Sequence, residues 1–147
     1  MEIITTSTED TMAFGAQLSP TLKGGMVLLL SGNLGAGKTA LVKGIAKGFG
    51  ITNEITSPTF ALMNMYPISG RLPDVDQLIH IDTYRLKNEA ELIEIGVEDY
   101  LGKPNTVCII EWPEKITSLL ERIEKTKIMT ISIEQLEEAG SRRILLS

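Results

Sequence analysis

The sequence predicts an α/β fold, a three-layer sandwich in which helices cover both faces of a mostly parallel central sheet. Two continuous apolar runs, at residues 26–30 and 106–110, are typical of strands that are buried on both faces. Segments with helical spacing alternate with strand-like segments along the chain, and two strand-like segments close it. This order favours a parallel centre with antiparallel additions and a C-terminal hairpin.

The spacing of apolar residues predicts the individual elements. Helices are expected at residues 7–18, 39–50, 88–101 and 114–125, with Ser7 and Asn88 as N-caps of the first and third. Strands are expected at 26–30, 59–66, 78–81, 106–112, 128–134 and 142–147. Glycine and proline within residues 68–76 indicate a hairpin turn, and Gly140 is expected in the turn before the last strand.

Size and charge limit the possible classes of protein. With 147 residues, 43% of them hydrophobic, the chain can bury one sizeable core, so a single domain over residues 1–147 is expected. The net charge of −5 argues against a general nucleic-acid coat. The single cysteine, Cys108, cannot form a disulfide within the chain and is interpreted as a buried core residue.

The location of the protein follows from what the sequence lacks. The first eleven residues have neither the basic region nor the apolar region of a signal peptide. The apolar run "MVLLL" is too short to span a bilayer. We therefore expect a cytoplasmic protein without membrane contact.

The stretch "GNLGAGKT", residues 32–39, matches the phosphate-binding pattern GxxxxGK[ST]. Glycines such as Gly35 and Gly37 let backbone N–H groups turn onto phosphate oxygens, and the following helix adds its positive end. Lys38 is expected to bridge the β- and γ-phosphates, and the Thr39 hydroxyl to bind Mg²⁺. The predicted nucleotide-binding segment comprises Gly32, Asn33, Leu34, Gly35, Ala36, Gly37, Lys38, Thr39 and Ala40.

Two carboxylates follow buried strands and are candidates for the chemistry. Asp82 ends the strand "LIHID", and Glu111 ends "TVCIIE". The carboxyl ends of parallel strands lie on the ligand side of such a sheet. One acid can bind Mg²⁺, directly or through water, and the other can orient the attacking water or act as base.

Other residues have two interpretations each. The only histidine, His80, is expected to satisfy a hydrogen bond rather than perform catalysis. The loop "TSPTF" at 56–60 is either a γ-phosphate sensor or an ordinary turn. Trp112 either packs in the fold or flanks the nucleotide base. Tyr84 and Arg85 form either a surface pair or part of a partner site.

Taken together, "GNLGAGKT", "TSPTF", "HIDTYRL", "ELIEIGVEDYL" and "IIEWPEK" resemble the TsaE family, formerly called YjeE, in the same order. These are small bacterial P-loop ATPases needed to make threonylcarbamoyladenosine in tRNA. The resemblance extends from the N-terminal helix to the final hairpin. It implies a P-loop NTPase-like fold that binds and slowly hydrolyses ATP with Mg²⁺. It also implies a complex with the TsaD and TsaB proteins, and contact with tRNA only through that complex.

The resemblance also implies roles for particular residues. Thr39 and Glu111 correspond to Mg²⁺ ligands, Asp82 to the catalytic acid, and Lys38 to the lysine of the phosphate cradle, where it also takes part in catalysis. Thr59 corresponds to a switch threonine. In addition to the glycine loop, the resemblance places Thr8, Trp112 and Gly140 near the nucleotide. The chain departs from many members at Asn33, where they have Asp, and nucleotide binding is expected to survive because this position mainly makes a backbone turn.

Three other functions share the glycine-rich motif. A small-molecule kinase would need an arginine-bearing lid, and the five arginines of this chain suggest none. A GTPase-like switch would need the guanine-reading NKxD pattern, which the sequence lacks. A partner that binds ATP for structure alone has no distinguishing feature in the sequence.

Overall fold

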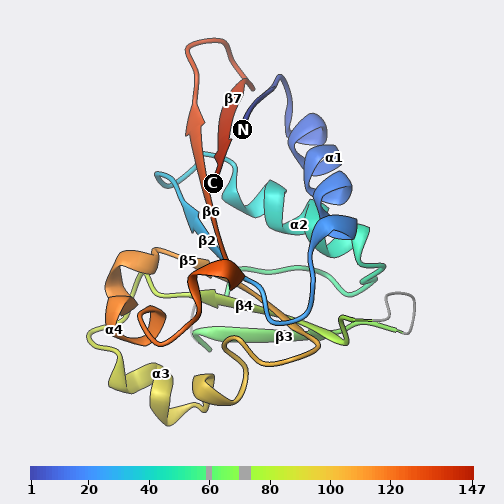
Figure 1. Cartoon of the computed structure of the whole chain (residues 1–147). Coiled ribbons are helices and arrows are strands. Elements are labelled where there is room, and N and C mark those ends of the chain that lie inside the picture. The colour runs from blue at the N-terminus through green and yellow to red at the C-terminus, as the bar shows by residue number, and fades with distance from the viewer. Residues whose placement is uncertain (59–60, 70–73) are drawn as a thin grey trace.

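A computed structural model describes residues 1–58, 61–69 and 74–147 of the chain (Figure 1). Its centre is a seven-stranded sheet in the order β1-β7-β6-β2-β5-β4-β3. The strands are β1 (Glu2–Thr5), β2 (Val27–Ser31), β3 (Met63–Pro67), β4 (Gln77–Asp82), β5 (Thr106–Glu111), β6 (Ile128–Gln135) and β7 (Arg142–Leu146). Strands β6, β2, β5 and β4 run parallel, whereas β3, β7 and β1 are antiparallel to their neighbours. The predicted parallel centre with antiparallel additions and a final hairpin is confirmed.

Helices cover both faces of the sheet (Figure 1). Helices α1 (Thr8–Leu18) and α2 (Lys38–Gly48) pack on one face, and the shorter α3 (Ala90–Glu94) and α4 (Thr117–Leu120) lie on the other. Successive residues of β5 point to opposite faces, so Ile109 joins the core under α1 and α2 while Cys108 and Ile110 join the second core. The two cores confirm the predicted three layers, and all six residues of β5 are buried.

The first helix begins as the sequence predicts. Ser7 is the N-cap of α1, and its hydroxyl accepts a hydrogen bond from the Asp10 backbone N–H at 3.0 Å. In return, the Asp10 carboxylate accepts one from the Thr6 N–H at 2.9 Å. This reciprocal capping satisfies two N–H groups that have no partner within the helix.

Three predicted elements are shorter than expected. The helix predicted at 88–101 is broken by Gly96, whose left-handed φ of 88° ends α3 and lets both Leu92 and Val97 turn into the core, and Asn88 is not its N-cap. Only residues 117–120 of the helix predicted at 114–125 are α-helical. Of the strand predicted at 59–66, residues 59–60 lie outside the described residues, and β3 begins at Met63, after Leu62 with a φ of 64°.

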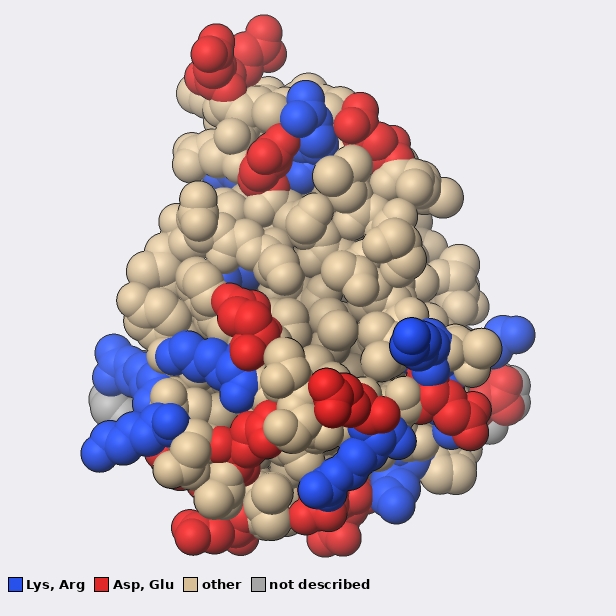
Figure 2. Space-filling model, turned by 60° about the vertical axis from the view of Figure 1, so that its left-hand side comes forward, with Lys and Arg blue, Asp and Glu red and all other residues tan. Residues whose placement is uncertain are grey.

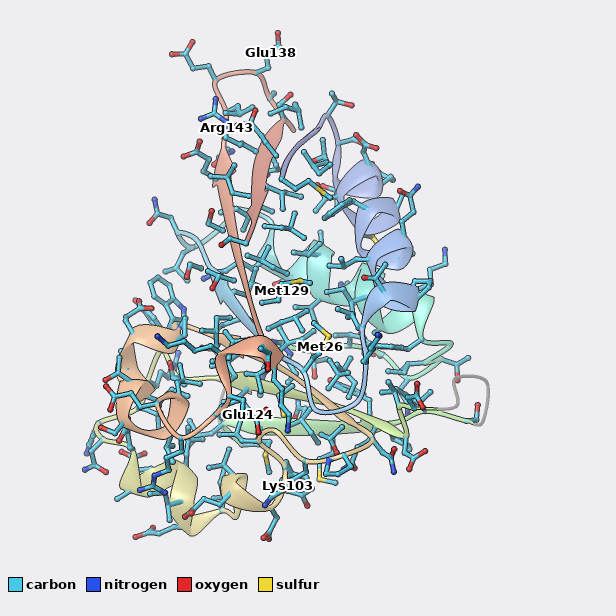
Figure 3. The ribbon with its side chains drawn as sticks, in the orientation of Figure 1. Met26, Lys103, Glu124, Met129, Glu138 and Arg143 are labelled. Carbon is cyan, nitrogen blue, oxygen red and sulfur yellow. The ribbon has the colours of Figure 1, made fainter. Side chains whose placement is uncertain are left out.

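The N-terminal strand β1 was not predicted from the sequence. It is an edge strand of four residues that pairs with β7, far away in sequence. Arg143 of β7, labelled in Figure 3, lies at this edge. One of its guanidinium nitrogens is 2.7 Å from a Glu134 carboxylate oxygen, and another is 3.6 Å from one of Glu2. The same figure places Glu138 at the tip of the connection between β6 and β7.

Charged side chains of both signs are interspersed on the face seen in Figure 2, chiefly at its upper and lower ends, with an uncharged belt between them. This agrees with the mildly acidic net charge of −5. In the part of the chain that the structure describes, no helix has the length and apolar character needed to cross a membrane.

Candidate nucleotide site

The glycine loop, residues 32–37, connects the buried strand β2 to the first residue of α2, Lys38. Gly37 is the N-cap of α2 and has a φ of 109°, in the left-handed region that favours glycine. A Cβ at this position would lie 3.2 Å from the Arg142 Nε. The loop therefore has the strand–loop–helix setting that the motif requires, and it lies close to Arg142, a residue that was not predicted for the site.

The amine of Lys38 has three neighbouring groups. It donates a hydrogen bond to the Gly32 carbonyl oxygen at 2.7 Å. It lies 3.8 Å from a Glu111 carboxylate oxygen and 4.0 Å from the centroid of the Trp112 ring. The lysine side chain is only 6% exposed, so these interactions hold its charge at the base of the glycine loop.

Glu111 and His80 form a buried pair beside this lysine. The second carboxylate oxygen of Glu111 lies 2.6 Å from His80 Nε2. The strands bring them together because Asp82 pairs with Glu111 in register, which puts His80, two residues earlier, diagonal to Glu111 on the same face. The expectation that His80 satisfies a hydrogen bond is confirmed.

Asp82, at the end of β4, is turned toward the same opening. One of its oxygens accepts a hydrogen bond from the Tyr84 N–H at 2.9 Å, and the other accepts one from the Ser57 hydroxyl at 3.3 Å. Ser57 belongs to the "TSPTF" loop, which therefore reaches this carboxylate. Thr59 of the same loop, the predicted switch residue, lies outside the described residues.

Trp112 follows Glu111 in a left-handed conformation, with a φ of 58° that is uncommon for a large side chain. The Thr83 hydroxyl donates to the carbonyl oxygen of Trp112 at 2.5 Å and lies 3.0 Å from that of Glu111. The ring also contacts Tyr84, with the ring centroids 5.1 Å apart. These contacts fix the indole over the Lys38 amine, so Trp112 packs against the lysine of the glycine-rich motif.

A cavity of about 450 Å³, a volume suited to a small ligand, opens at this site. Its lining comprises Thr8, Met12, Leu34, Gly35, Gly37, Lys38, Thr39, Ala40, Lys43, Ser57, Asp82, Tyr84, Glu111, Trp112 and Arg142. Of the residues predicted for the site, Gly32, Asn33, Ala36 and Gly140 are outside this lining. Gly140 instead lies against the backbone of Thr6, whose carbonyl oxygen would be 3.1 Å from an added Cβ.

Charge is distributed unevenly around the cavity. Asp82 and Glu111 come from β4 and β5, on one side of β2 in the sheet order. Arg142 comes from β7, on the other side, and Lys43 comes from α2. The cavity thus has a carboxylate side, which also holds the Lys38 amine, and an Arg142 side, with the glycine loop between them.

Arg142 and Met12 were missed because only the tertiary fold brings them to the glycine loop. Arg142 follows the loop by about a hundred residues of sequence and reaches it through the strand order β7-β6-β2. A sequence signal for it was weak: two adjacent arginines, 142 and 143, open the last strand, and the strand pattern cannot tell which one faces the loop.

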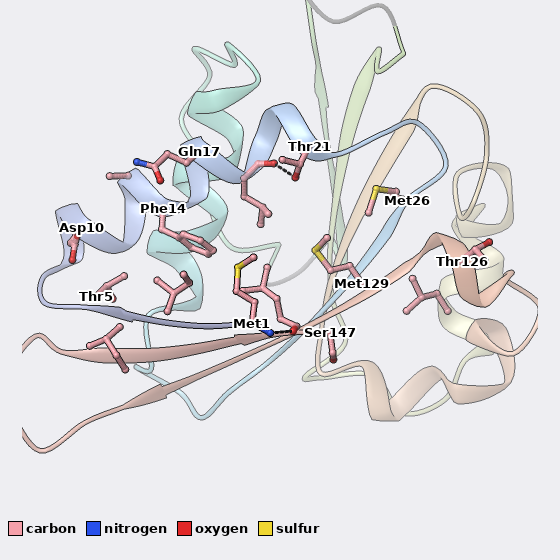
Figure 4. A pocket seen from close by; sticks show the side chains of 16 residues that line it. Met1, Thr5, Asp10, Phe14, Gln17, Thr21, Met26, Thr126, Met129 and Ser147 are labelled. Carbon is pink, nitrogen blue, oxygen red and sulfur yellow. Dashed lines mark hydrogen bonds between the residues drawn. The ribbon is translucent and has the colours of Figure 1, made fainter.

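A larger cavity, about 810 Å³, lies between α1 and the strands β1, β6 and β7 (Figure 4). Apolar side chains such as Phe14, Met26 and Met129 dominate its lining. Asp10 is the only side chain of this lining with a formal charge, and its carboxylate already caps α1. This cavity therefore lacks the grouped polar side chains that distinguish the smaller one.

Comparisons with known proteins match one family over most of the chain. The family model "Threonylcarbamoyl adenosine biosynthesis protein TsaE" matches residues 5–144. The tRNA threonylcarbamoyladenosine biosynthesis protein TsaE of Treponema pallidum is 39% identical over 147 residues, which is 100% of both chains. The Synechocystis protein of the same name is 42% identical over 122 residues, 81% of this chain and 74% of that protein.

A solved structure supports the fold. The crystal structure of Bacillus subtilis YdiB has a TM-score of 0.73 and 28% sequence identity, with 98% of this chain and 82% of that chain covered. The predicted fold class is thereby confirmed.

Proposed function

The chain belongs to the TsaE family, which takes part in tRNA threonylcarbamoyladenosine biosynthesis, and from this premise we propose that it is a Mg²⁺-dependent ATPase. The observation that carries the proposal is the single cavity in which the glycine loop, the N-terminus of α2 and the two strand-end carboxylates meet. Loop N–H groups, a helix N-terminus and Lys38 suit the oxygens of a polyphosphate.

The uneven charge supports one orientation of the nucleotide. Mg²⁺ and the terminal phosphate belong on the carboxylate side, beside Asp82 and Glu111, because a cation is needed between these acids and the phosphate. Arg142 then lies on the side of the inner phosphates and the nucleoside. We propose that Arg142 contributes to nucleotide affinity rather than to the chemical step.

The residues present fit a Mg²⁺ ion that is shared with phosphate. Thr39 and Glu111 line the same cavity, and one Glu111 oxygen faces Lys38. The Thr39 hydroxyl and the Glu111 carboxylate offer the oxygen atoms that Mg²⁺ prefers as ligands. The described residues contain no cluster of three or more His, Cys, Asp or Glu side chains that could hold a metal alone. This agrees with Mg²⁺, which takes one or two protein oxygens and completes its shell with phosphate and water.

We propose that Asp82 orients the water that attacks the terminal phosphorus. The new phosphorus–oxygen bond forms as the bond to the bridging oxygen breaks, which gives ADP and phosphate. The Lys38 amine neutralises charge on the phosphate oxygens, and Asp82 accepts a hydrogen bond or the proton from the water. Of the described residues that line the cavity, the one arginine is Arg142, across the glycine loop from Asp82, so hydrolysis by the chain alone should be slow.

We further propose that ATP turnover serves the TsaD–TsaB complex, in which the modification itself takes place. The family assignment supports a role in that pathway. The net charge of −5 and the interspersed charges of Figure 2 support contact with tRNA only through the complex.

The test is ATP turnover by the purified chain, alone and with TsaD and TsaB, compared with Asp82→Ala. We expect a slow rate that rises with the partners and is lost in the variant, while ATP binding persists. GTP and candidate kinase acceptors are assayed in parallel. A rate that is fast alone and indifferent to the partners, a phosphorylated acceptor, or an unimpaired Asp82→Ala would refute the proposal.

A further inference from the structure

We propose that His80 is a positioning residue that holds the Glu111 carboxylate in the orientation needed to bind Mg²⁺. This inference rests on the proposed function and adds a residue to it. His80 is 2% exposed and Glu111 is 5% exposed, so neither side chain is oriented by bulk water. The 2.6 Å contact between His80 Nε2 and a Glu111 oxygen is the polar interaction that fixes that oxygen.

The two oxygens of Glu111 have different surroundings. One is bound by His80, and the other lies 3.8 Å from the Lys38 amine in the nucleotide cavity. A glutamate side chain has three rotatable bonds, and a hydrogen bond to one oxygen removes most of this freedom. With the inner oxygen held, the outer oxygen is presented to the cavity, where a cation beside the phosphates can meet it.

The histidine itself is placed by the sheet. β4 and β5 are parallel neighbours, and the pairing of His80 with Ile109 and of Asp82 with Glu111 fixes the distance between the imidazole and the carboxylate. A histidine two residues before the last residue of β4 therefore bridges to the last residue of β5. Hydrogen-bonded partners behind metal ligands commonly contribute about ten- to a hundredfold in metal affinity.

The ring has no second polar role among the described residues. His80 Nδ1 is buried and has no hydrogen-bond partner there. Because the Glu111 carboxylate can only accept, Nε2 is the donor of this bond, and a lone pair at the unpartnered Nδ1 is cheaper to bury than an unpaired N–H. Replacing His80 thus removes one polar interaction, the one to Glu111, and this makes substitution at this position a clean test.

The experiment compares His80→Leu, which removes the donor, with His80→Gln, whose amide can donate from nearly the same place. Calorimetric titration with ADP is performed in Mg²⁺ and in EDTA, and thermal melting checks that each variant is folded. For His80→Leu we expect unchanged ADP affinity in EDTA and a loss of about tenfold in the extra affinity that Mg²⁺ confers. His80→Gln should restore most of that loss.

A double-mutant cycle identifies the route of the effect. In a Glu111→Gln background, His80→Leu should have little further effect on the Mg²⁺-dependent affinity, because the group through which it acts is gone. Equal losses from His80→Leu in both backgrounds, failure of His80→Gln to restore affinity, or a Mg²⁺ effect unchanged by His80→Leu would overturn the positioning role alone. A wild-type chain that binds no ADP, or binds it without any Mg²⁺ effect, would overturn the proposed function together with it.

Discussion

The Lys38 amine lies 4.0 Å from the centroid of the Trp112 ring and donates a hydrogen bond to the Gly32 carbonyl oxygen at 2.7 Å. The lysine that the motif assigns to phosphate is thus in contact with the only tryptophan of the chain. A phosphate between the loop and the lysine would compete with these contacts, because it offers the amine a full negative charge. The indole therefore lies where it can report ligand binding.

We predict that ADP or ATP changes the fluorescence of Trp112. The change arises because the ammonium group moves relative to the ring and the polarity around the indole alters. It is measured by titration of the wild-type chain, whose emission comes from this one tryptophan. In Lys38→Met the change should shrink and the affinity fall. Nucleotide binding shown by calorimetry without any change in emission would contradict this prediction.

Arg142→Ala is predicted to weaken the binding of ADP and ATP to a similar degree, by about tenfold or more, as expected when a charged hydrogen bond to phosphate is lost. The turnover rate at saturating ATP should change much less, because Arg142 lies away from the carboxylate side of the cavity. The measurement is ADP affinity together with the separate effects on kcat and KM.

The neighbouring arginine supplies a matched control for that variant. Arg143 has the same charge, but it pairs with Glu134 and Glu2 at the edge of the sheet, outside the cavity lining. Arg143→Ala should leave nucleotide affinity within about twofold of wild type, since losing surface ion pairs has small effects. Equal losses of affinity in the two variants would show that net charge, rather than contact, explains the effect of Arg142.

Gly44→Ala is predicted to destabilise the fold, although alanine favours helices over glycine by about 1 kcal/mol. A Cβ at Gly44 would lie 2.1 Å from the Met12 carbonyl oxygen of α1. Helix α1 would have to move, which we expect to cost about 1–3 kcal/mol in the free energy of unfolding. Because Thr8 and Met12 of α1 line the cavity, nucleotide affinity should fall as well.

Chemical denaturation measures this effect, with Lys47→Ala as the control in the same helix. Lys47 is exposed, so its replacement should change the free energy of unfolding by no more than about 0.5 kcal/mol. A Gly44→Ala variant as stable as Lys47→Ala would show that α1 and α2 do not pack as closely as the structure indicates.

Local sequence signals predicted the parts of the fold that depend on local interactions. The strand before the glycine loop, the loop itself and the start of α2 follow each other in sequence, so apolar periodicity and the motif located them together. Ser7 was also recognised because its capping partner, Asp10, is three residues away. Asp82 and Glu111 were predicted as site residues because each ends a buried strand, and both line the cavity.

Features that depend on distant pairing were not predictable. Strand β1 exists because β7 pairs with it, and four residues of alternating exposure give too weak a pattern on their own. Arg142 reaches the glycine loop only through the order of the strands. The helix predicted at 88–101 is shorter because Gly96 adopts a left-handed conformation that ends it, and apolar spacing alone does not reveal this.

Cys108 is predicted to be unreactive in the folded protein. The side chain is 0% exposed, and burial raises the pKa of its thiol to about 12, against a small opposing effect of a backbone hydrogen bond at Gly102. At about pH 8 the reactive thiolate is therefore nearly absent. Labelling with a thiol reagent should be slow in native conditions and complete in denaturant, and rapid labelling of the native chain would contradict the burial seen here.

The same thiol should make stability depend on pH at the alkaline end. Between pH 9.0, the ordinary pKa of a thiol, and about pH 12, the raised pKa of Cys108, the unfolded state loses the Cys108 proton while the folded state retains it. The folded state then binds more protons, so the free energy of unfolding decreases as pH rises through this range, and below it the thiol has no effect. Denaturation across this range should show a shallower decline for Cys108→Ala than for the wild type, because the variant lacks this ionisation and shares all others. Parallel declines in the two proteins would mean that the thiol ionises as readily in the folded chain as in the unfolded one.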